Sequence, residues 1–219
     1  DEVNIHPNRS LSNQEKVKDT INYKGFNFIQ DSVFFKPKYL KPYVLIRPGN
    51  NYNPKLSRFT SRRLSSISTY KFVSIDYQEK DSVTDENGKR HLNADIFLSP
   101  LKKRSLRLEL QGVTKSNNFA GPNLSVVYSN RNLFKGGELL RLSASGGYEQ
   151  QFFGQTENQG LSSIQLGLNA SLLFPRLIFP IDLNESFEYA IPKTKVSLGF
   201  DYLNRTQLYT LNSINSSFG

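Results

Sequence analysis

Residue types that perform covalent chemistry or hold metal ions are sparse in this sequence of 219 residues. It has no cysteine, and its two histidines, His6 and His91, lie far apart. Without cysteine, disulfides, cysteine zinc sites and thiol catalysis are excluded, and no catalytic constellation is visible. We therefore expect a protein that is not an enzyme and that holds no metal and no other cofactor.

The most distinctive polar stretch is YSNRNLFKGGE, residues 128–138, which lies between two runs of alternating apolar and polar residues. Such flanks predict a β-hairpin, and Gly136-Gly137 is expected to supply its turn. Asn130 and Asn132 are expected to hydrogen-bond backbone groups where strand pairing stops. The sequence therefore predicts a specialised turn at this point of the chain.

The elements around this turn have the period of β-strands. An amphipathic helix would space its apolar residues three and four apart, which these runs do not. Two architectures fit: a soluble β-sandwich with its polar face in water, and a membrane β-barrel with its apolar face in lipid. The five alternating runs, with a candidate sixth, are 106–111, 123–129, 140–149, 164–172, 196–202 and 208–218.

Three details favour the barrel over the sandwich. The polar faces of the runs are rich in Ser, Gly and Asn rather than in Lys and Glu, as suits a confined interior. Several runs approach the ~9–11 residues that cross a membrane obliquely. Aromatic residues that suit an interfacial girdle gather at the run ends. These residues are Tyr148, Phe152, Phe153, Phe174, Phe179 and Tyr202.

The connections predict which side of a membrane each turn faces. If the first strand runs outward, 129–137 is a tight periplasmic turn, and Leu133 and Phe134 are expected to anchor it at the inner membrane interface. Two roles stay open for Arg131: contact with a neighbouring domain or lipid phosphate, or local hydrogen bonds that hold the turn. Extracellular loops are expected at 113–122 and at 150–160. A flap at the membrane surface is expected at 174–192.

The first half of the chain predicts a small α/β module. Asn53 is a suitable cap and Pro54 a suitable first residue for a helix at 53–67, and a shorter helix is expected at 36–46. Strands are expected at 3–7, 70–78 and 91–100. The predicted order is therefore β-α-α-β-β.

The basic residues are concentrated in this first half. Residues 1–104 carry 19 basic and 11 acidic residues, whereas 105–219 carry 9 and 8. Such an excess fits an anionic membrane surface, nucleic acid, or solubility alone. The sequence has no starting Met, no signal-peptide core and no run of ~20 apolar residues that would form a spanning helix. We expect the chain to begin at an internal point of a longer protein.

Two stretches resemble a known family. IRPGNNYNPKLSRFTSRRLSSISTYKFVSIDY, at 46–77, resembles a POTRA domain in its Pro-Gly-x-x-Tyr-Asn junction, helix and aromatic-Val strand. LQGVTKSNNFAGPNLSVVYSNRNLFKGGELLRLSASGGYEQQ, at 110–151, resembles the first barrel strands of the BamA/TamA outer-membrane assembly superfamily. It is most similar to the TamA-like lipoprotein branch (TamL) of Bacteroidetes, where an Asn-Arg-Asn-Leu-Phe turn between barrel strands two and three is typical.

The resemblance implies both a fold and a location. The fold is an α/β POTRA domain (β-α-α-β-β), the last of its series, at 1–101, followed at 102–219 by the N-terminal part of a transmembrane antiparallel β-barrel. The location is the outer membrane of a Gram-negative cell, with the POTRA domain in the periplasm. A barrel of about sixteen strands is implied. The chain supplies six at most, so we expect a fragment without the remaining strands and the upstream POTRA domains.

The resemblance also implies a function without covalent chemistry. The first barrel strand is expected to pair weakly with the last, so that its open edge can add a client β-strand. This lateral-gate strand comprises Arg104, Ser105, Leu106, Arg107, Leu108, Glu109, Leu110, Gln111 and Gly112. The periplasmic turn comprises Asn130, Arg131, Asn132, Leu133, Phe134, Gly136 and Gly137. A POTRA edge strand that could meet a periplasmic partner comprises Lys71, Phe72, Val73, Ser74, Ile75, Asp76 and Tyr77.

Three functions compete. The first is an assembly factor that inserts client β-barrel proteins, in contact with membrane lipid and other outer-membrane subunits. The second is a transport module that works with a TamB-like periplasmic protein to deliver lipid or protein to the outer membrane. The third is a soluble basic β-domain that binds nucleic acid or glycans. The third lacks Gly-aromatic RNA motifs and an aromatic strand face for base stacking, so no nucleic acid is expected as a partner.

Overall fold

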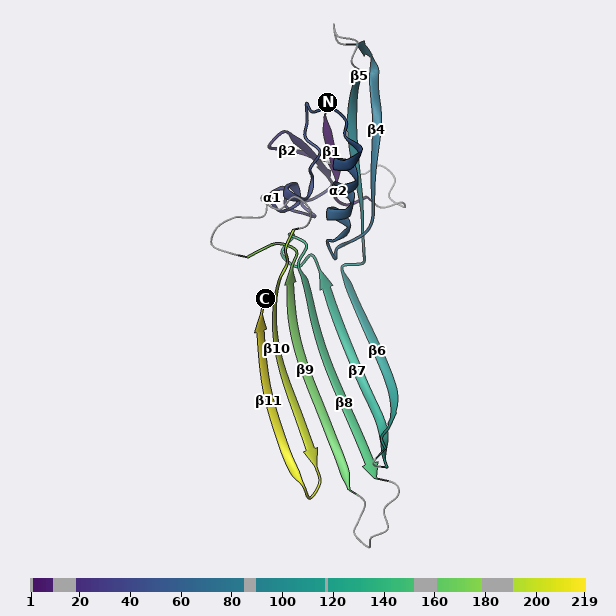
Figure 1. Ribbon diagram of the computed structural model, residues 1–219, viewed down its shortest axis with the longest axis vertical. Coiled ribbons are helices and arrows are strands. Elements are labelled where there is room, and N and C mark those ends of the chain that lie inside the picture. Colours follow the sequence, from purple (N-terminus) through teal and green to yellow (C-terminus); the bar gives the residue numbers. More distant parts are fainter. Residues whose placement is uncertain (1, 10–18, 85–89, 117, 152–160, 179–190) are drawn as a thin grey trace. The chain divides into compact units, whose positions relative to one another are not determined.

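The computed structural model describes residues 2–9, 19–84, 90–116, 118–151, 161–178 and 191–219. The chain divides into two compact units (Figure 1). The first unit comprises Asp1–Lys103, Arg131–Glu138 and Phe174–Thr194. The second unit comprises Arg104–Asn130, Leu139–Leu173 and Lys195–Gly219.

The first unit is built on a mixed sheet of five strands in the order β2-β3-β1-β5-β4. Strand β1 is parallel to both of its neighbours, β3 and β5, while the pairs β2–β3 and β4–β5 are antiparallel. The strands are β1 Val3–His6, β2 Asp19–Tyr23, β3 Phe26–Gln30, β4 Tyr70–Thr84 and β5 Arg90–Pro100.

The predicted order β-α-α-β-β is incomplete, because the hairpin β2–β3 lies between β1 and the first helix. Lys24 and Gly25 form its two-residue turn with φ values of 51° and 81°. Such a turn needs positive φ at both positions, and Asn-Gly is its usual signal. Lys-Gly is a weaker one, which is why the sequence did not reveal the hairpin. The POTRA topology expected for this unit is therefore not established.

Two short helical segments and one longer helix follow the hairpin: α1 Pro37–Leu40, η1 Lys41–Tyr43 and α2 Pro54–Ser65. Helix α2 begins as the sequence predicts. The Oδ1 atom of Asn53 accepts a hydrogen bond of 2.9 Å from the backbone N–H of Lys55, and Pro54 occupies the first turn. The helix packs against β4. No helix in the described part of the chain is long and apolar enough to cross a membrane.

The core of the first unit lies between the sheet and these helices. It is contiguous and draws side chains from nearly every element of the unit. Its fully buried apolar side chains are Ile5, Phe28, Phe35, Leu40, Leu64, Ile67, Ile96 and Leu98. The first unit thus has the hydrophobic core of an ordinary folded domain.

The second unit is a single antiparallel sheet in which the strands follow one another in chain order, β6 to β11 (Figure 1). Every alternating run predicted from the sequence, including the candidate sixth, overlaps one of these strands. The strands are β6 Arg104–Thr114, β7 Phe119–Arg131, β8 Leu139–Gln151, β9 Ser162–Phe174, β10 Thr194–Arg205 and β11 Tyr209–Phe218. The sheet is not closed among the described residues: β6 and β11 are its margins.

Replacing Ile96 by Ala tests the assigned core. Ile96 is fully buried on β5, so Ile96→Ala should lower the free energy of unfolding of the first unit by about 2–5 kcal/mol. Urea unfolding followed by the near-ultraviolet circular dichroism of tyrosine measures it. Phe72→Ala on the neighbouring strand is the control, because that ring is largely exposed. An equal loss in the two variants would contradict the assigned core.

Candidate functional site

The predicted periplasmic turn is a seven-residue loop and not a two-residue hairpin turn. Strand β7 ends at Arg131 and β8 begins at Leu139. We call this loop, together with Arg131 at the end of β7, the Glu138 loop; its residues 131–138 belong to the first unit. Positive φ occurs at Asn132 (60°), at Lys135 (61°) and at Gly137 (84°). The expectation that Gly136-Gly137 alone makes the turn is therefore wrong.

The carboxylate of Glu138 organises this loop from inside. The side chain is fully buried, and its Oε2 accepts hydrogen bonds from the backbone N–H groups of Phe134 (3.1 Å) and Gly136 (3.0 Å). Its Oε1 accepts a hydrogen bond of 2.8 Å from Nη2 of Arg176. The buried anion thus has a cation and two backbone donors as partners, which is what burial of a charge requires.

Arg176 holds the loop from a distant point in the sequence. Its Nη1 donates to the backbone carbonyl of Gly136 at 3.1 Å. Its guanidinium lies 4.0 Å from the centre of the Tyr39 ring, within the range of a cation–π interaction. Gly136 has little space around it, because a Cβ there would overlap the Glu138 carboxylate and lie 2.8 Å from Tyr39 Cδ2. The arrangement therefore needs glycine at this position.

Asn132 connects the loop to the segment before α1. Its Oδ1 accepts a hydrogen bond of 3.0 Å from the N–H of Gly137, and its Nδ2 donates one of 2.7 Å to the carbonyl of Phe34. A backbone hydrogen bond of 2.8 Å from Lys36 to the carbonyl of Lys135 runs beside it. Asn132 thus satisfies backbone groups where strand pairing stops, as expected.

The other predicted turn residues have different surroundings. Asn130 is buried opposite Arg104 in the β6–β7 ladder, and its Oδ1 has no hydrogen-bond partner, contrary to the expected role. Nη1 of Arg131 donates to the carbonyl of Lys102 at 3.3 Å, which lies outside the turn and 29 positions earlier in the chain, so the role of Arg131 stays a prediction. Leu133 is half-buried and Phe134 is exposed. A role for the last two at a membrane interface stays a prediction.

The two residues that contribute most to the loop, Glu138 and Arg176, were not among the predicted site residues. Glu138 was available as the acid that ends YSNRNLFKGGE at the start of a largely apolar strand. Arg176 gave no signal, because it lies in the long connection after β9 and meets the loop only in the folded chain. The flap expected at 174–192 and the loop expected at 150–160 lie mostly outside the described residues.

The predicted gate strand is β6, which contains all of residues 104–112. It pairs with β7 along its whole length and has no second neighbour among the described residues. Leu106, Leu108 and Leu110 are 68%, 68% and 72% exposed. These leucines are therefore not part of a core, and the outer margin of β6 carries backbone donors and acceptors without strand partners.

The register of the second unit gathers its apolar side chains on one side of the sheet, which we call the apolar face. Residues opposite each other in an antiparallel ladder share a face. Leu108 lies opposite Val126, Ala144 opposite Leu168, and Phe200 opposite Ile214. Side chains from β7, β8, β9 and β10 also line one hollow on this face. The other face carries Ser, Gly, Asn and a few charged residues, such as Ser145 beside Gly167.

The predicted POTRA edge strand, 71–77, lies in β4, at the margin of the five-stranded sheet. Val73, Ile75 and Tyr77 pack toward the core, whereas Phe72 is exposed. The Tyr77 hydroxyl is hydrogen-bonded to Ser57, and burial raises the pKa of Tyr77 more than this bond lowers it.

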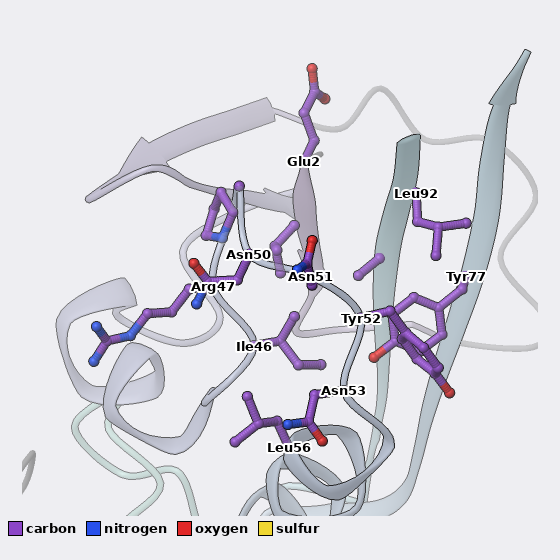
Figure 2. A pocket seen from close by; sticks show the side chains of 14 residues that line it. Glu2, Ile46, Arg47, Asn50, Asn51, Tyr52, Asn53, Leu56, Tyr77 and Leu92 are labelled. Carbon is purple, nitrogen blue, oxygen red and sulfur yellow. The ribbon is translucent and has the colours of Figure 1, made fainter. Parts of the chain in front are cut away.

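A small hollow of ≈50 Å³ adjoins Tyr77. Figure 2 shows Tyr52 and Tyr77 together on one side of it, and their ring centres are 4.8 Å apart in an edge-to-face arrangement. Tyr52 is 55% exposed. An exposed aromatic ring such as Tyr52, beside a strand at the margin of the described sheet, is suited to contact another protein.

Comparison with known proteins gives only coarse likenesses. No protein-family model matches this sequence, and no curated protein does. CdiB from Acinetobacter baumannii is similar in structure with a TM-score of 0.42 and 10% identity, over 89% of this chain and 43% of that chain. BamA from Haemophilus ducreyi, lacking POTRA domains 1–3, has a TM-score of 0.34 and 10% identity, over 92% and 48%. The chain thus spans less than half the length of either neighbour, and neither likeness supports the TamL branch in particular.

Removing the charge of Glu138 tests its role in the loop. Glu138→Gln leaves Arg176 without its anion, so the free energy of unfolding of the first unit should fall by about 3–5 kcal/mol. A double-mutant cycle with Arg176→Gln, measured by urea unfolding, should give a coupling energy of about 1–3 kcal/mol.

The matched control for this cycle is Glu79→Gln. Glu79 also pairs with an arginine, Arg90, at 3.1 Å, but both side chains are largely exposed. Such pairs contribute about 0–1 kcal/mol. A cycle at Glu138 that gives no more coupling than the Glu79 pair would show that the loop does not depend on its buried carboxylate.

Proposed function

We propose that this chain belongs to an outer-membrane assembly factor, in which the first unit is a periplasmic POTRA domain and the second is the front part of a transmembrane barrel. Strand β6 acts as a lateral gate that adds strands of client β-barrel proteins. The observation that carries the proposal is the margin of β6, which has a strand neighbour on one side only within the described part of the chain, while its leucines are exposed. No covalent chemistry, metal or cofactor is part of this mechanism.

The apolar face supports a membrane location. Leu168, Leu198 and Ile214 are all more than half exposed. Monomeric soluble proteins rarely expose a contiguous apolar patch of this kind, because contact with water is unfavourable by ~25 cal/mol per Å². A closed barrel in lipid needs no second layer on such a sheet, because the apolar face meets lipid and the polar face lines the lumen.

The margin of β6 supports strand addition. Backbone N–H and C=O groups accept any client sequence, so a single gate can serve many clients. The alternation of the gate strand supplies the register, because a shift by one residue would place the polar side chains of the client on the lipid side. A client strand that pairs with β6 thereby extends the apolar face by one strand.

The margin of β4 supports contact with a periplasmic partner. Such a partner would add its backbone to residues 71–77 and place a side chain near Tyr52 and Tyr77. A TamB-like protein would use this route in the competing transport function, and other outer-membrane subunits would use it in an assembly complex. The assembly function is preferred because it also uses β6.

A charge placed on either face of β9 tests the membrane assignment. Leu168→Arg puts a guanidinium on the apolar face, so the free energy of partition into phosphatidylcholine vesicles should become less favourable by about 2–4 kcal/mol. Asn169→Arg, one residue further on and on the opposite face, should change it little. Flotation of the full chain with vesicles in a density gradient measures both. Equal losses would contradict a lipid-facing apolar face.

A cross-linking experiment tests the gate. The chain has no native cysteine, so Arg107→Cys introduces a single thiol on β6. In vesicles, it should form a disulfide with a transmembrane-strand peptide that carries one cysteine, because the peptide can pair with the open margin. Ser143→Cys on β8, which is flanked by β7 and β9, should not. Equal yields at the two positions would contradict strand addition at β6.

A further inference from the structure

An open hollow of ≈540 Å³ in the first unit is lined by basic residues from four separate segments. Lys24 comes from the β2–β3 turn, Lys41 from η1, Arg47 from the segment that follows, and Arg63 from α2. No acidic residue is among the described residues that line it. We call this the basic hollow. None of its lining residues belongs to β6 or to the Glu138 loop.

Arg63 is the unusual member of this group. The residue is 3% exposed, yet its Nε and Nη2 atoms have no hydrogen-bond partner in the described part of the chain. A buried, unpaired charge is costly, and proteins normally pair it. Burial accordingly lowers the pKa of the Arg63 guanidinium, and the nearby Tyr43 opposes this change. Two of the three guanidinium nitrogens of Arg63 have no partner among the described residues.

The other basic residues of the hollow lie where their side chains could contact a bound anion together with Arg63. Lys24 and Arg47 are exposed at the rim. Figure 2 shows the Arg47 guanidinium directed away from Tyr52 and Tyr77, although Arg47 lines both the small hollow beside β4 and the basic hollow. The Gly25 backbone lies close to Pro48, since a Cβ on Gly25 would be 3.9 Å from Pro48 Cγ. The turn that carries Lys24 is therefore held against the segment that carries Arg47.

The chemistry of these groups selects an oxyanion. A guanidinium with two adjacent unpaired N–H groups binds two oxygens of one anion in parallel, which suits phosphate and carboxylate. Four cationic side chains exceed what a single carboxylate needs, whereas a phosphate monoester carries up to two charges and three terminal oxygens.

We propose that the basic hollow is a phosphate-binding site, with Arg63 at its base and Lys24 and Arg47 at its rim, which takes the phosphate of a lipid headgroup or free phosphate. The hollow is open enough to admit a headgroup. The proposal concerns the first unit alone and does not depend on the gate function of β6.

Binding of inorganic phosphate to the full chain, measured by isothermal titration calorimetry against acetate at equal ionic strength, tests the site. The double variant Lys24→Asn/Arg47→Gln removes the rim charges, and asparagine suits the positive φ of position 24. We expect about tenfold weaker phosphate binding in this variant. The matched control, Lys55→Asn/Arg58→Gln, removes the same charge from exposed positions outside the hollow and should bind like the unmodified chain.

Arg63→Met provides a second test that separates binding from folding. It replaces the unpaired cation by an apolar side chain of similar length, so it should abolish phosphate binding while raising the thermal midpoint in phosphate-free buffer. Phosphate should raise the midpoint of the unmodified chain and not of this variant. A lower midpoint for Arg63→Met in phosphate-free buffer would mean that Arg63 is structural and would count against the site.

Vesicles distinguish the two sources of phosphate. Phosphatidylcholine vesicles with and without phosphatidic acid are compared, with inorganic phosphate as competitor. Binding to phosphatidic acid that is lost in the Lys24→Asn/Arg47→Gln variant identifies a headgroup site, and binding of inorganic phosphate alone identifies a free-phosphate site. Binding of neither, equal losses in both double variants, or binding of a glutamate-rich peptide in place of phosphate would overturn the proposal.

Discussion

The constraint on which the second unit depends is that backbone hydrogen-bonding groups must be satisfied. In water, an open strand margin is solvated at little cost. In hydrocarbon, each unpaired N–H or C=O costs several kcal/mol. The apolar face favours hydrocarbon, while the margins of β6 and β11 oppose it. Pairing of further strands with these margins would meet both demands, so the proposed membrane location and the proposed strand addition have one physical cause.

In the Glu138 loop, the interactions restrict the chain between β7 and β8 to one conformation. A buried ion pair adds little net stability, because desolvation offsets most of the attraction. The ion pair instead restricts the conformation of the loop. A conformation that separated Glu138 from Arg176 would leave the buried carboxylate without its cation. The positive φ values and the space around Gly136 restrict the loop further. A loop defined this closely suits a contact surface better than a flexible linker does.

Local signals made part of the fold predictable from sequence. The cap of α2 needs only Asn53 and its near neighbours, and the alternation of a strand such as β9 is contained in the strand itself. Features that depend on distant partners were not predictable. Glu138 and Arg176 are 38 positions apart, and no local pattern joins them. The hairpin at Lys24 was missed because its turn lacks the usual residues. Alternation identifies the leucines of β6 as one face but not which strand lies beside them.

Two arginines of the first unit, the partly buried Arg176 and the buried Arg63, differ in how the chain pairs their guanidinium groups. Arg176 meets a carboxylate, a carbonyl and an aromatic ring, so the protein itself supplies every partner that it needs. Arg63, more deeply buried, is given no anion by the described chain, and the residues that share its hollow add to the positive charge. Because the first unit supplies these partners for Arg176, unpaired nitrogen atoms at Arg63 call for a specific explanation. An unpaired cation that costs stability is best explained when its partner comes from outside, and the basic rim then serves to attract that anion.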